Sequence, residues 1–414
     1  MDEISLKGKD IVIVGLQPWY FPTGCNAKDI AVRLSAHNRV LYVNFPLKRK
    51  AYFARNTDPM IRQHVHILRQ KEEKLRIVAP NIWEYYPSSL IESVNWLPYT
   101  KAHKAVNYFN NRRLAGDIRQ ATSQLGFRDI ILFNDNDIYN GFYLKELLTP
   151  SLYIYYFRDF LQGYDYWKKH TSILEPQLLR KSDLVVANSI YYAAYSKEYN
   201  PNSWYIGQGC NLQAFDHQKS EGQPAELQGL KRPLVGYIGA LDTARLDENI
   251  IRIIARKIPA CTVVLVGPED DRFRQSDLHT IPNILFTGGK PFDQLSAFVR
   301  SFDVCINPQL QNQITKGNYP LKIDEYLAIG KPVVATKTMA MEAFKDHTYL
   351  ADTPDEYPGL ILKAIAENDS RKEKERIAFA QSHTWENSVA ELSKAIIRTL
   401  NDKSHKTRHR TTIV

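Results

Sequence analysis

Runs of apolar residues recur along the first half of the chain, and each run ends in polar residues. The clearest are DIVIVGL from residue 10, DIILFNDND from residue 129, SLYIYYFRDF from residue 151 and DLVVANS from residue 183. Between them, residues 26–37 and 102–125 carry the apolar spacing of helices. This alternation of strand and helix is typical of a parallel sheet whose faces are covered by helices.

The second half repeats the alternation after a polar stretch at residues 214–232, where we place a linker. The apolar runs PLVGYIGAL, CTVVLVGP, NILFTGG, VCINP and PVVAT follow, with helical stretches between them. The sequence therefore predicts an α/β protein with two Rossmann-like, doubly wound parallel-sheet domains, at residues 1–213 and 233–385. A helix is predicted over 386–402, and the basic stretch 403–414 is predicted to be disordered.

Composition and charge narrow the class of protein. The 414 residues are 44% hydrophobic and 24% charged, which is ordinary for a soluble protein, and 414 residues are enough for two cores. We find no apolar run of the roughly 18 residues that a membrane span needs, and acids and lysines stand where a signal peptide would be apolar. We therefore expect a cytoplasmic protein. The net charge of +9 permits nucleic acid, an anionic membrane or acidic substrates as partners.

The cysteines and histidines give no sign of a metal site. Four cysteines are scattered without Cys-x-x-Cys spacing, which argues against both zinc and a disulfide framework. The eleven histidines show no HExxH-like spacing. The NDND stretch at 134–137 lacks the glycine and the distal glutamate of an EF-hand loop.

The stretch PLKIDEYLAIGKPVVAT predicts a short helix followed by a buried strand. Pro320 suits the first helical turn, Gly330 suits a left-handed cap, and Pro332 prevents continuation. Lys322 and Glu325, three residues apart, then share one face near the positive helix N-terminus. An anionic ligand is expected there.

Several motifs together resemble one enzyme family. PLKIDEYLAIGKPVVAT resembles the donor-binding signature of glycosyltransferase family 4, GQGCNLQAF at 207–215 resembles its interdomain hinge, and VGYIGAL and HTW also match. The resemblance implies a GT-B fold, with two domains facing a cleft and a C-terminal helix returning to the first domain. It also implies that Glu325 holds the ribose of a nucleotide sugar and that no metal is required. The first half looks most like bacterial enzymes of teichuronic acid and exopolysaccharide assembly.

Two departures from the family pattern concern the diphosphate. The position eight before Glu325, where the family often has a carboxylate, is Gly317. The family's arginine and lysine after the second domain's first turn fall on Ala240 and Arg245, so one cation is missing. We expect Lys322, backbone N–H groups around Leu321, or Lys316 to replace it.

Further candidate ligand-binding residues stand at other strand ends, and each has a purely structural role as its alternative. Gly239, Gly267 and Asn307 end strands of the second domain, where they either adjoin the nucleotide or simply form turns. Thr23 and Gly24, between the first strand and its helix, either present backbone N–H groups to a phosphate or sugar or belong to an ordinary capped loop.

YYFRDF supplies the candidate catalytic residues. A carboxylate at a strand end can remove the proton of an acceptor hydroxyl, so Asp159 is the candidate base and Arg158 its partner or a phosphate contact. The alternative is that Asp159 belongs to a structural ion pair. The histidine that many family-4 enzymes carry near this point is absent, which leaves retention or inversion open.

Basic and aromatic residues gather in FPLKRKAYFAR and WLPYTKAHKAVNYFNNRR, at residues 45–55 and 96–113. This mixture suits a surface that meets anionic lipid, and it equally suits a solvated face with aromatics pointing inward. We find no nucleic-acid-binding module, so nucleic acid is not expected as a partner.

The sequence thus predicts a glycosyltransferase that moves a sugar from a UDP- or GDP-linked donor to a saccharide or lipid-linked acceptor in cell-surface polysaccharide synthesis. A nucleotide-sugar epimerase on the same fold is one alternative. A catalytically inactive nucleotide-sugar-binding scaffold is the other. No tightly bound cofactor is expected, because the nucleotide sugar is itself a substrate.

Overall fold

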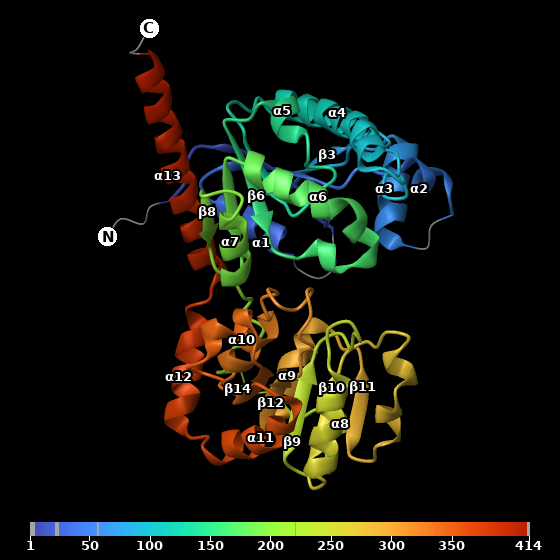
Figure 1. Cartoon of the computed structure of the whole chain (residues 1–414), viewed down its shortest axis with the longest axis vertical. Coiled ribbons are helices and arrows are strands. Elements are labelled where there is room, and N and C mark those ends of the chain that lie inside the picture. The colour runs from blue at the N-terminus through green and yellow to red at the C-terminus, as the bar shows by residue number, and fades with distance from the viewer. Residues whose placement is uncertain (1–4, 21–24, 56–57, 220, 412–414) are drawn as a thin grey trace. The chain divides into compact units, whose positions relative to one another are not determined.

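The computed structural model describes residues 5–20, 25–55, 58–219 and 221–411. The chain divides into two compact units, one reaching to Gly207 and resuming at Trp385, the other formed by Gln208–Thr384 (Figure 1). The boundary lies earlier in the chain than the linker predicted at 214–232. That segment belongs to the second unit because Phe215 and Leu227 are buried in its core.

The first unit is built on one largely parallel sheet. Its strands follow the order β3-β4-β2-β1-β5-β6-β7-β8, and within the described residues only β3 runs antiparallel to its neighbour. The strands are β1 (Asp10–Gly15), β2 (Arg39–Val43), β3 (Leu75–Ala79), β4 (Ile82–Tyr85), β5 (Ile131–Asp135), β6 (Leu152–Phe157), β7 (Leu184–Ala187) and β8 (Ser203–Tyr205). The helices are α1 (Asn26–Leu34), α2 (Arg49–Phe53), α3 (Pro59–Gln70), α4 (Thr100–Gln124), α5 (Leu144–Leu148), α6 (Asp165–Lys181), α7 (Ile190–Lys197) and α13 (Trp385–Thr411).

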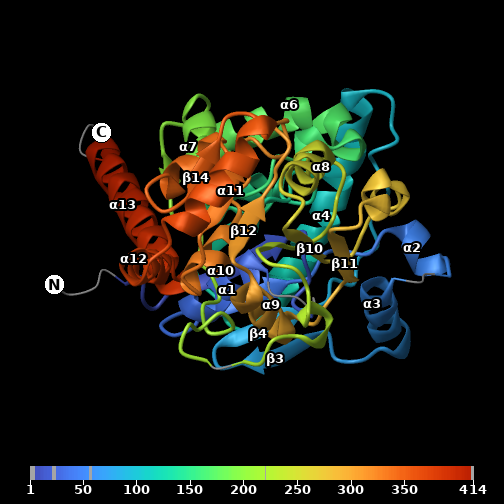
Figure 2. The ribbon, with the colours of Figure 1, turned by 90° about the horizontal axis from the view of Figure 1, so that it is seen from below.

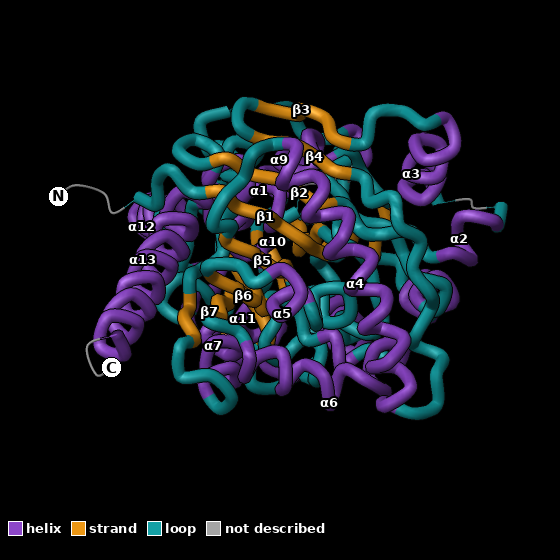
Figure 3. Tube along the Cα trace, turned by 90° about the horizontal axis from the view of Figure 1, so that it is seen from above, coloured by secondary structure: helices purple, strands orange, loops and turns teal. Residues whose placement is uncertain are grey.

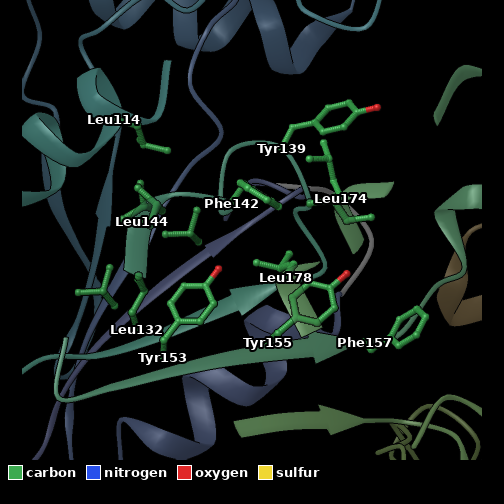
Figure 4. Packing of buried hydrophobic residues seen from close by; sticks show 14 of the residues in the cluster. Leu114, Leu132, Tyr139, Phe142, Leu144, Tyr153, Tyr155, Phe157, Leu174 and Leu178 are labelled. Carbon is green, nitrogen blue, oxygen red and sulfur yellow. The ribbon is translucent and has the colours of Figure 1, made fainter. Parts of the chain in front are cut away.

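Alternation along the strands builds a core on each face of this sheet. In β6, Tyr153, Tyr155 and Phe157 point into the cluster covered by α4, α5, α6 and α7 (Figure 4), whereas Ile154 and Tyr156 pack toward α1 and α13. Figure 3 shows α4 and α13 on opposite sides of the central strands. Burial on both faces explains why these strands are apolar almost throughout.

Helix α13 belongs to the first unit although it follows the second in sequence. Trp385, Leu392 and Ile396 are buried in the cluster that covers α1, which shows the predicted return of the C-terminal helix. The helix continues to Thr411, past residue 402 where we placed its end. The ammonium of Lys403 donates a 2.8 Å hydrogen bond to the carbonyl of Ser151, which ties part of the predicted tail to the sheet.

The second unit is a parallel sheet in the order β11-β10-β9-β12-β13-β14, the strand order of a Rossmann fold. Helices α8 and α11 cover one face, and α9 and α10 cover the other (Figure 2). The strands are β9 (Leu234–Ile238), β10 (Thr262–Val266), β11 (Ile284–Gly288), β12 (Val304–Asn307), β13 (Val333–Thr336) and β14 (Tyr349–Ala351). The helices are α8 (Glu248–Lys257), α9 (Leu295–Ser301), α10 (Leu321–Ala328), α11 (Tyr357–Ala366) and α12 (Ser370–Gln381).

Both units therefore confirm the predicted class of two Rossmann-like domains. Both leave the carboxyl ends of their parallel strands as the edge where ligands of such sheets bind. Within the described residues, no helix is long and apolar enough to cross a membrane.

Candidate functional site

Helix α10 is fixed by its two ends. Pro320 stands just before the helix rather than inside it, and its carbonyl accepts a 2.9 Å hydrogen bond from the N–H of Ile323. Gly330 has a φ of +82°, the left-handed conformation that glycine adopts without strain, and a Cβ there would lie 2.4 Å from Cγ of Glu373. The predicted end of the helix is confirmed, and β13 follows it at once.

Glu325 carries a carboxylate that the protein leaves without a partner. Its side chain makes no hydrogen bond or ion pair within the part of the chain that the structure describes. The residue retains some exposure to solvent, yet burial raises its pKa to about 7. The positive charge of Lys322 lowers this pKa, and the negative charge of Asp324 raises it. An unpaired, desolvated carboxylate is the state expected of a group that awaits hydroxyl donors.

The neighbouring carboxylate, Asp324, is buried, and each of its two oxygens has a polar partner. It accepts a 2.8 Å hydrogen bond from the hydroxyl of Tyr319, and Nδ1 of His383 lies 2.7 Å from its other oxygen. Burial raises the pKa of Asp324, while His383 lowers it. His383 packs on Phe379 and also holds the Asp324 carboxylate.

Sequence reasoning missed Asp324 and Tyr319 as members of this network. Asp324 and His383 are 59 positions apart, and nothing in the local sequence pairs them. The network anchors the first turn of α10 to the segment before α13, and this fixes which face of α10 Glu325 occupies.

Lys322 lies over the ends of β9 and β10. Its ammonium is 5.0 Å from the ring centre of Tyr237, and its Cε is 3.2 Å from the position that a Cβ on Gly239 would take. A Cβ on Gly267 would lie 1.9 Å from the carbonyl oxygen of Gly239. The two glycines are therefore needed for close backbone approach, and Lys322 crosses the point where they meet.

Two further candidates of the second unit, Asn307 and Arg245, lie in or contact the segment from Asn307 to Lys316. Asn307 ends β12, its carbonyl accepts a 3.0 Å hydrogen bond from the Tyr357 hydroxyl, and its Nδ2 is buried without a partner among the described residues. The carbonyl of Arg245 accepts from the N–H of Leu310 at 2.8 Å, and its Nε lies 3.6 Å from Asp242.

The structure gives less support to two of the expected diphosphate contacts, the N–H of Leu321 and the ammonium of Lys316. The N–H of Leu321 donates to the carbonyl of Tyr319 at 3.1 Å, so this amide is already used. Lys316 is exposed and lines a surface hollow with Gln311, Lys337 and Thr338. Of the candidate cations, Lys322 is the one that the structure places beside the strand-end glycines.

In the first unit, Arg158 gathers two carboxylates. Its Nε donates to Asp135 at 2.7 Å and its Nη2 to the same carboxylate at 3.3 Å, while Nη1 donates to Asp159. The side chain of Asp135 is fully buried, whereas that of Asp159 is 31% exposed. Burial lowers the pKa of the Arg158 guanidinium, but the two carboxylates outweigh this effect and the pKa is raised. This cluster carries a net negative charge at the carboxyl ends of β5 and β6.

Asn136 and Gly15 shape this cluster. Asn136 has a φ of +55°, and its side chain accepts from the N–H of Arg158 at 3.0 Å and donates to the carbonyl of Asp159 at 3.1 Å. A Cβ on Gly15 would lie 2.8 Å from Cβ of Asp135, so glycine leaves room for the buried acid. The predicted partnership of Arg158 and Asp159 is present, and Asp135 joins it.

Thr23 and Gly24 lie outside the described residues. The NDND stretch forms a turn closed on itself, because Asp137 accepts from the N–H groups of Tyr139 and Asn140 and its own N–H donates to Asn134. Across the described parts of the chain, no group of three or more His, Cys, Asp or Glu side chains is arranged to hold a metal ion.

Solved structures of several sugar-metabolising enzymes share the fold of the whole chain. Sucrose-phosphate synthase from Thermosynechococcus elongatus has a TM-score of 0.59 at 13% identity and covers 99% of this chain and 100% of its own. The α,α-trehalose 6-phosphate synthase of Burkholderia multivorans has a TM-score of 0.66 at 12% identity, covering 97% and 100%. Anabaena HepE, solved with UDP and glucose, has a TM-score of 0.60 at 16% identity, covering 95% and 99%. The fold is that of the GT-B glycosyltransferases.

The second unit can be assigned more narrowly. Residues 232–367 match the family model described as "Glycosyl transferases group 1". This range contains Gly239, Gly267, Lys322 and Glu325, the residues that surround α10 and the ends of β9 and β10. The resemblance to glycosyltransferases that the sequence predicts is therefore confirmed, and the match lies within the second unit.

One curated relative also matches part of the chain. It is the Bacillus subtilis (strain 168) protein assigned to teichuronic acid biosynthesis as glycosyltransferase TuaH, which is 28% identical over 189 residues. The match covers 44% of this chain and 47% of that protein, so it spans about half of the relative's length.

Proposed function

We propose that the protein is a glycosyltransferase that moves a sugar from a UDP-linked donor to a saccharide or lipid-linked acceptor. The observation that carries this proposal is the unpaired carboxylate of Glu325, which lies within the matched glycosyltransferase domain and beside a cation and two strand-end glycines. UDP is favoured over GDP because HepE, which shares the fold, has been solved with UDP-glucose.

In this proposal the second unit holds the donor. Glu325 accepts hydrogen bonds from the ribose hydroxyls, which are the donors that its carboxylate lacks in the free protein. Lys322 contacts the diphosphate and stabilises the charge that develops on it as the sugar leaves. Arg245 and Lys316 are the alternative cations for this second role, and Asn307 and the glycines let the nucleotide approach the strand ends.

The first unit supplies the base. The acceptor hydroxyl attacks the anomeric carbon, the bond from that carbon to the nucleotide diphosphate breaks, and the hydroxyl proton passes to Asp159. Arg158 touches neither reactant in this scheme and acts as a positioning residue. It fixes the carboxylate of Asp159, while Asp135 fixes the guanidinium from the buried side.

The direct test is incubation with a panel of UDP- and GDP-sugars and simple glycoside acceptors, followed by NMR of donor loss and of the anomeric proton of the product. Transfer from one donor is the expected result, and the anomeric form of the product distinguishes retention from inversion. Donor binding without turnover on any acceptor would favour the inactive scaffold. Change of the donor sugar itself without transfer would favour the epimerase.

We further propose that the first unit touches an anionic membrane, at the inner face of the plasma membrane, where a lipid-linked acceptor would be found. Phe53, Trp96 and Tyr99 are 71%, 71% and 73% exposed, and α2 buries none of its residues. Arg49 and Lys50 line the same surface hollow as Phe53 and Trp96. Exposed rings beside cations suit the headgroup region of an anionic bilayer.

Vesicle flotation tests the membrane contact. We expect binding to vesicles that contain phosphatidylglycerol and little binding to pure phosphatidylcholine, with a severalfold loss in the double variant Phe53→Ser/Trp96→Ser. Leu362→Ser, which changes a side chain that is 52% exposed in the second unit, is the matched control. Equal flotation of the double variant and the control would exclude this surface.

A further inference from the structure

A hollow of about 280 Å³ lies at the carboxyl ends of β1, β2 and β5 in the first unit. Leu16 follows β1, Phe45 follows β2 and Asp137 follows β5, and all three line it. In the sheet, β2 and β5 flank β1 on opposite sides, so the strand order reverses here. Ligands of doubly wound sheets bind at such switch points.

The walls of the hollow combine aromatic and aliphatic side chains with polar and charged ones, which make up eight of the nineteen described residues that line it. Tyr139 and Trp167 lie with ring centres 5.0 Å apart at 42°, and Tyr166 and Phe45 line the hollow beside them. Its volume of about 280 Å³ lies just below the roughly 300–1,000 Å³ range of small-molecule pockets. The hollow has the size for one small ring rather than for a long oligomer.

Asn107, on α4, lines this hollow and has an unsatisfied buried acceptor. Its side chain is 1% exposed, its Nδ2 donates to the carbonyl of Tyr139 at 2.8 Å, and its Oδ1 has no partner among the described residues. The nearby amides of Asn110 and Asn95 are already paired, with the backbone of Glu92 and the hydroxyl of Tyr139 respectively. Buried acceptors are rarely left unpaired in proteins, so Asn107 indicates a hydroxyl or N–H donor from a ligand.

We infer that this hollow binds one sugar ring of the acceptor, an inference that rests on the proposed function. The aromatic side chains offer flat faces to the C–H side of the ring, and a ring hydroxyl donates to Oδ1 of Asn107. The hollow adjoins the candidate base, because Asp137 follows Asn136, whose side chain binds the backbone of Arg158 and Asp159. A sugar held there presents a neighbouring hydroxyl to that cluster.

Saturation-transfer NMR of the full-length protein with methyl and hexyl glycosides tests the inference without any donor. We expect saturation of the ring protons of at least one methyl glycoside. Ala51→Phe fills the hollow from α2, which buries no residue, and should abolish the signal. Asn107→Leu should weaken binding about tenfold. Ala54→Phe, just beyond α2 and lining a different hollow, should leave it unchanged.

The outcomes separate this inference from the proposed function. If no glycoside binds, or if Ala51→Phe binds as well as wild type, the inference is wrong even where donor turnover is observed. If only the alkyl protons of the hexyl glycoside are saturated, the hollow holds an apolar chain and the inference is also overturned. Ring binding that is lost in Ala51→Phe, without transfer from any donor, would support a sugar site and contradict the transferase.

Discussion

The two units treat the carboxylates of their candidate sites in opposite ways. In the second unit, Glu325 stands half-buried without a hydrogen bond among the described residues, and burial raises its pKa. In the first unit, Asp135 and Asp159 share the guanidinium of Arg158. One carboxylate has no internal partner among the described residues, whereas the others are held in place by an internal cation.

We propose that the carboxylate of the second unit recognises a ligand, whereas the carboxylates of the first unit are held in position for the reaction. An unpaired carboxylate costs stability in the free protein and regains it when a ligand supplies hydrogen bonds. A carboxylate held by a buried arginine is oriented before any ligand arrives, which suits a group that must meet one reacting proton. The substitutions below should therefore affect ligand affinity in one unit, and rate or folding in the other.

The largest effect is expected for Asp159→Asn. The asparagine can still accept from Arg158, and the site is 31% exposed, so the fold should persist. Loss of the base should lower the transfer rate about 10²- to 10⁴-fold and leave donor affinity unchanged. Steady-state kinetics with the identified donor measure this, with Asp165→Asn at an exposed position of α6 as the control. A full transfer rate in Asp159→Asn would show that another group removes the proton.

Arg158→Met should lower the stability of the first unit as well as the transfer rate. It leaves the fully buried Asp135 without its cation, and loss of one partner of a buried ion pair costs about 3–5 kcal/mol. Urea unfolding of the full chain measures the change. Arg371→Met, at a pair with Glu375 that is largely exposed, should cost less than about 1 kcal/mol. The double variant Arg158→Met/Asp135→Asn should recover much of the loss, and its failure to do so would contradict the charge argument.

Glu325→Gln should weaken nucleotide binding with little damage to the fold. Charge-assisted hydrogen bonds contribute about 1.5–3 kcal/mol, so the affinity for UDP and for uridine should both fall roughly 10- to 150-fold. Isothermal calorimetry with the two ligands measures this, and Glu375→Gln on α12 is the control. Unchanged uridine affinity would place the ribose elsewhere.

The sequence was sufficient for the fold because its signals are local. Apolar runs that end in polar residues predict the parallel strands, and Gly330 with Pro332 predicts the end of α10. Spacing also places Lys322 and Glu325 on one helical face, in agreement with the effect of Lys322 on the pKa of Glu325. The unit boundary was misplaced because Phe215 and Leu227 are single buried residues within an otherwise polar stretch.

The arrangement of the candidate site could be predicted less well from the sequence, because its contacts join distant segments. Asp135 and Arg158 meet across two neighbouring strand ends, and Asp324 meets His383 across 59 positions. Adjacent acids such as Asp324 and Glu325 look alike in sequence. The family resemblance singles out Glu325, and the contacts of Asp324 with Tyr319 and His383 give the physical reason, because they leave Glu325 as the acid without a partner among the described residues.

Lys322→Met should affect the diphosphate and leave the ribose contact intact. Methionine keeps an apolar stem over Tyr237 but removes the charge, so UDP should bind about tenfold more weakly and uridine equally well. Arg245→Met and Lys316→Met, compared in the same calorimetric assay, show which cation replaces the missing family residue. An unchanged UDP affinity in Lys322→Met would assign that role to one of them.

The smallest effect concerns the stability of the free protein at different pH values. The pKa of Glu325 is about 7 in the folded chain, against 4.5 ordinarily, so the folded state binds the proton more tightly than the unfolded state. Ionisation of this group therefore lowers stability as pH rises from 4.5 to 7, and the penalty is complete above 7. Because the side chain is partly exposed, we expect Glu325→Gln to be more stable than wild type by about 1 kcal/mol at pH 8 and nearly equal at pH 4.5. Thermal unfolding at the two pH values checks this, and a variant that is less stable than wild type at pH 8 would mean that Glu325 has an internal partner after all.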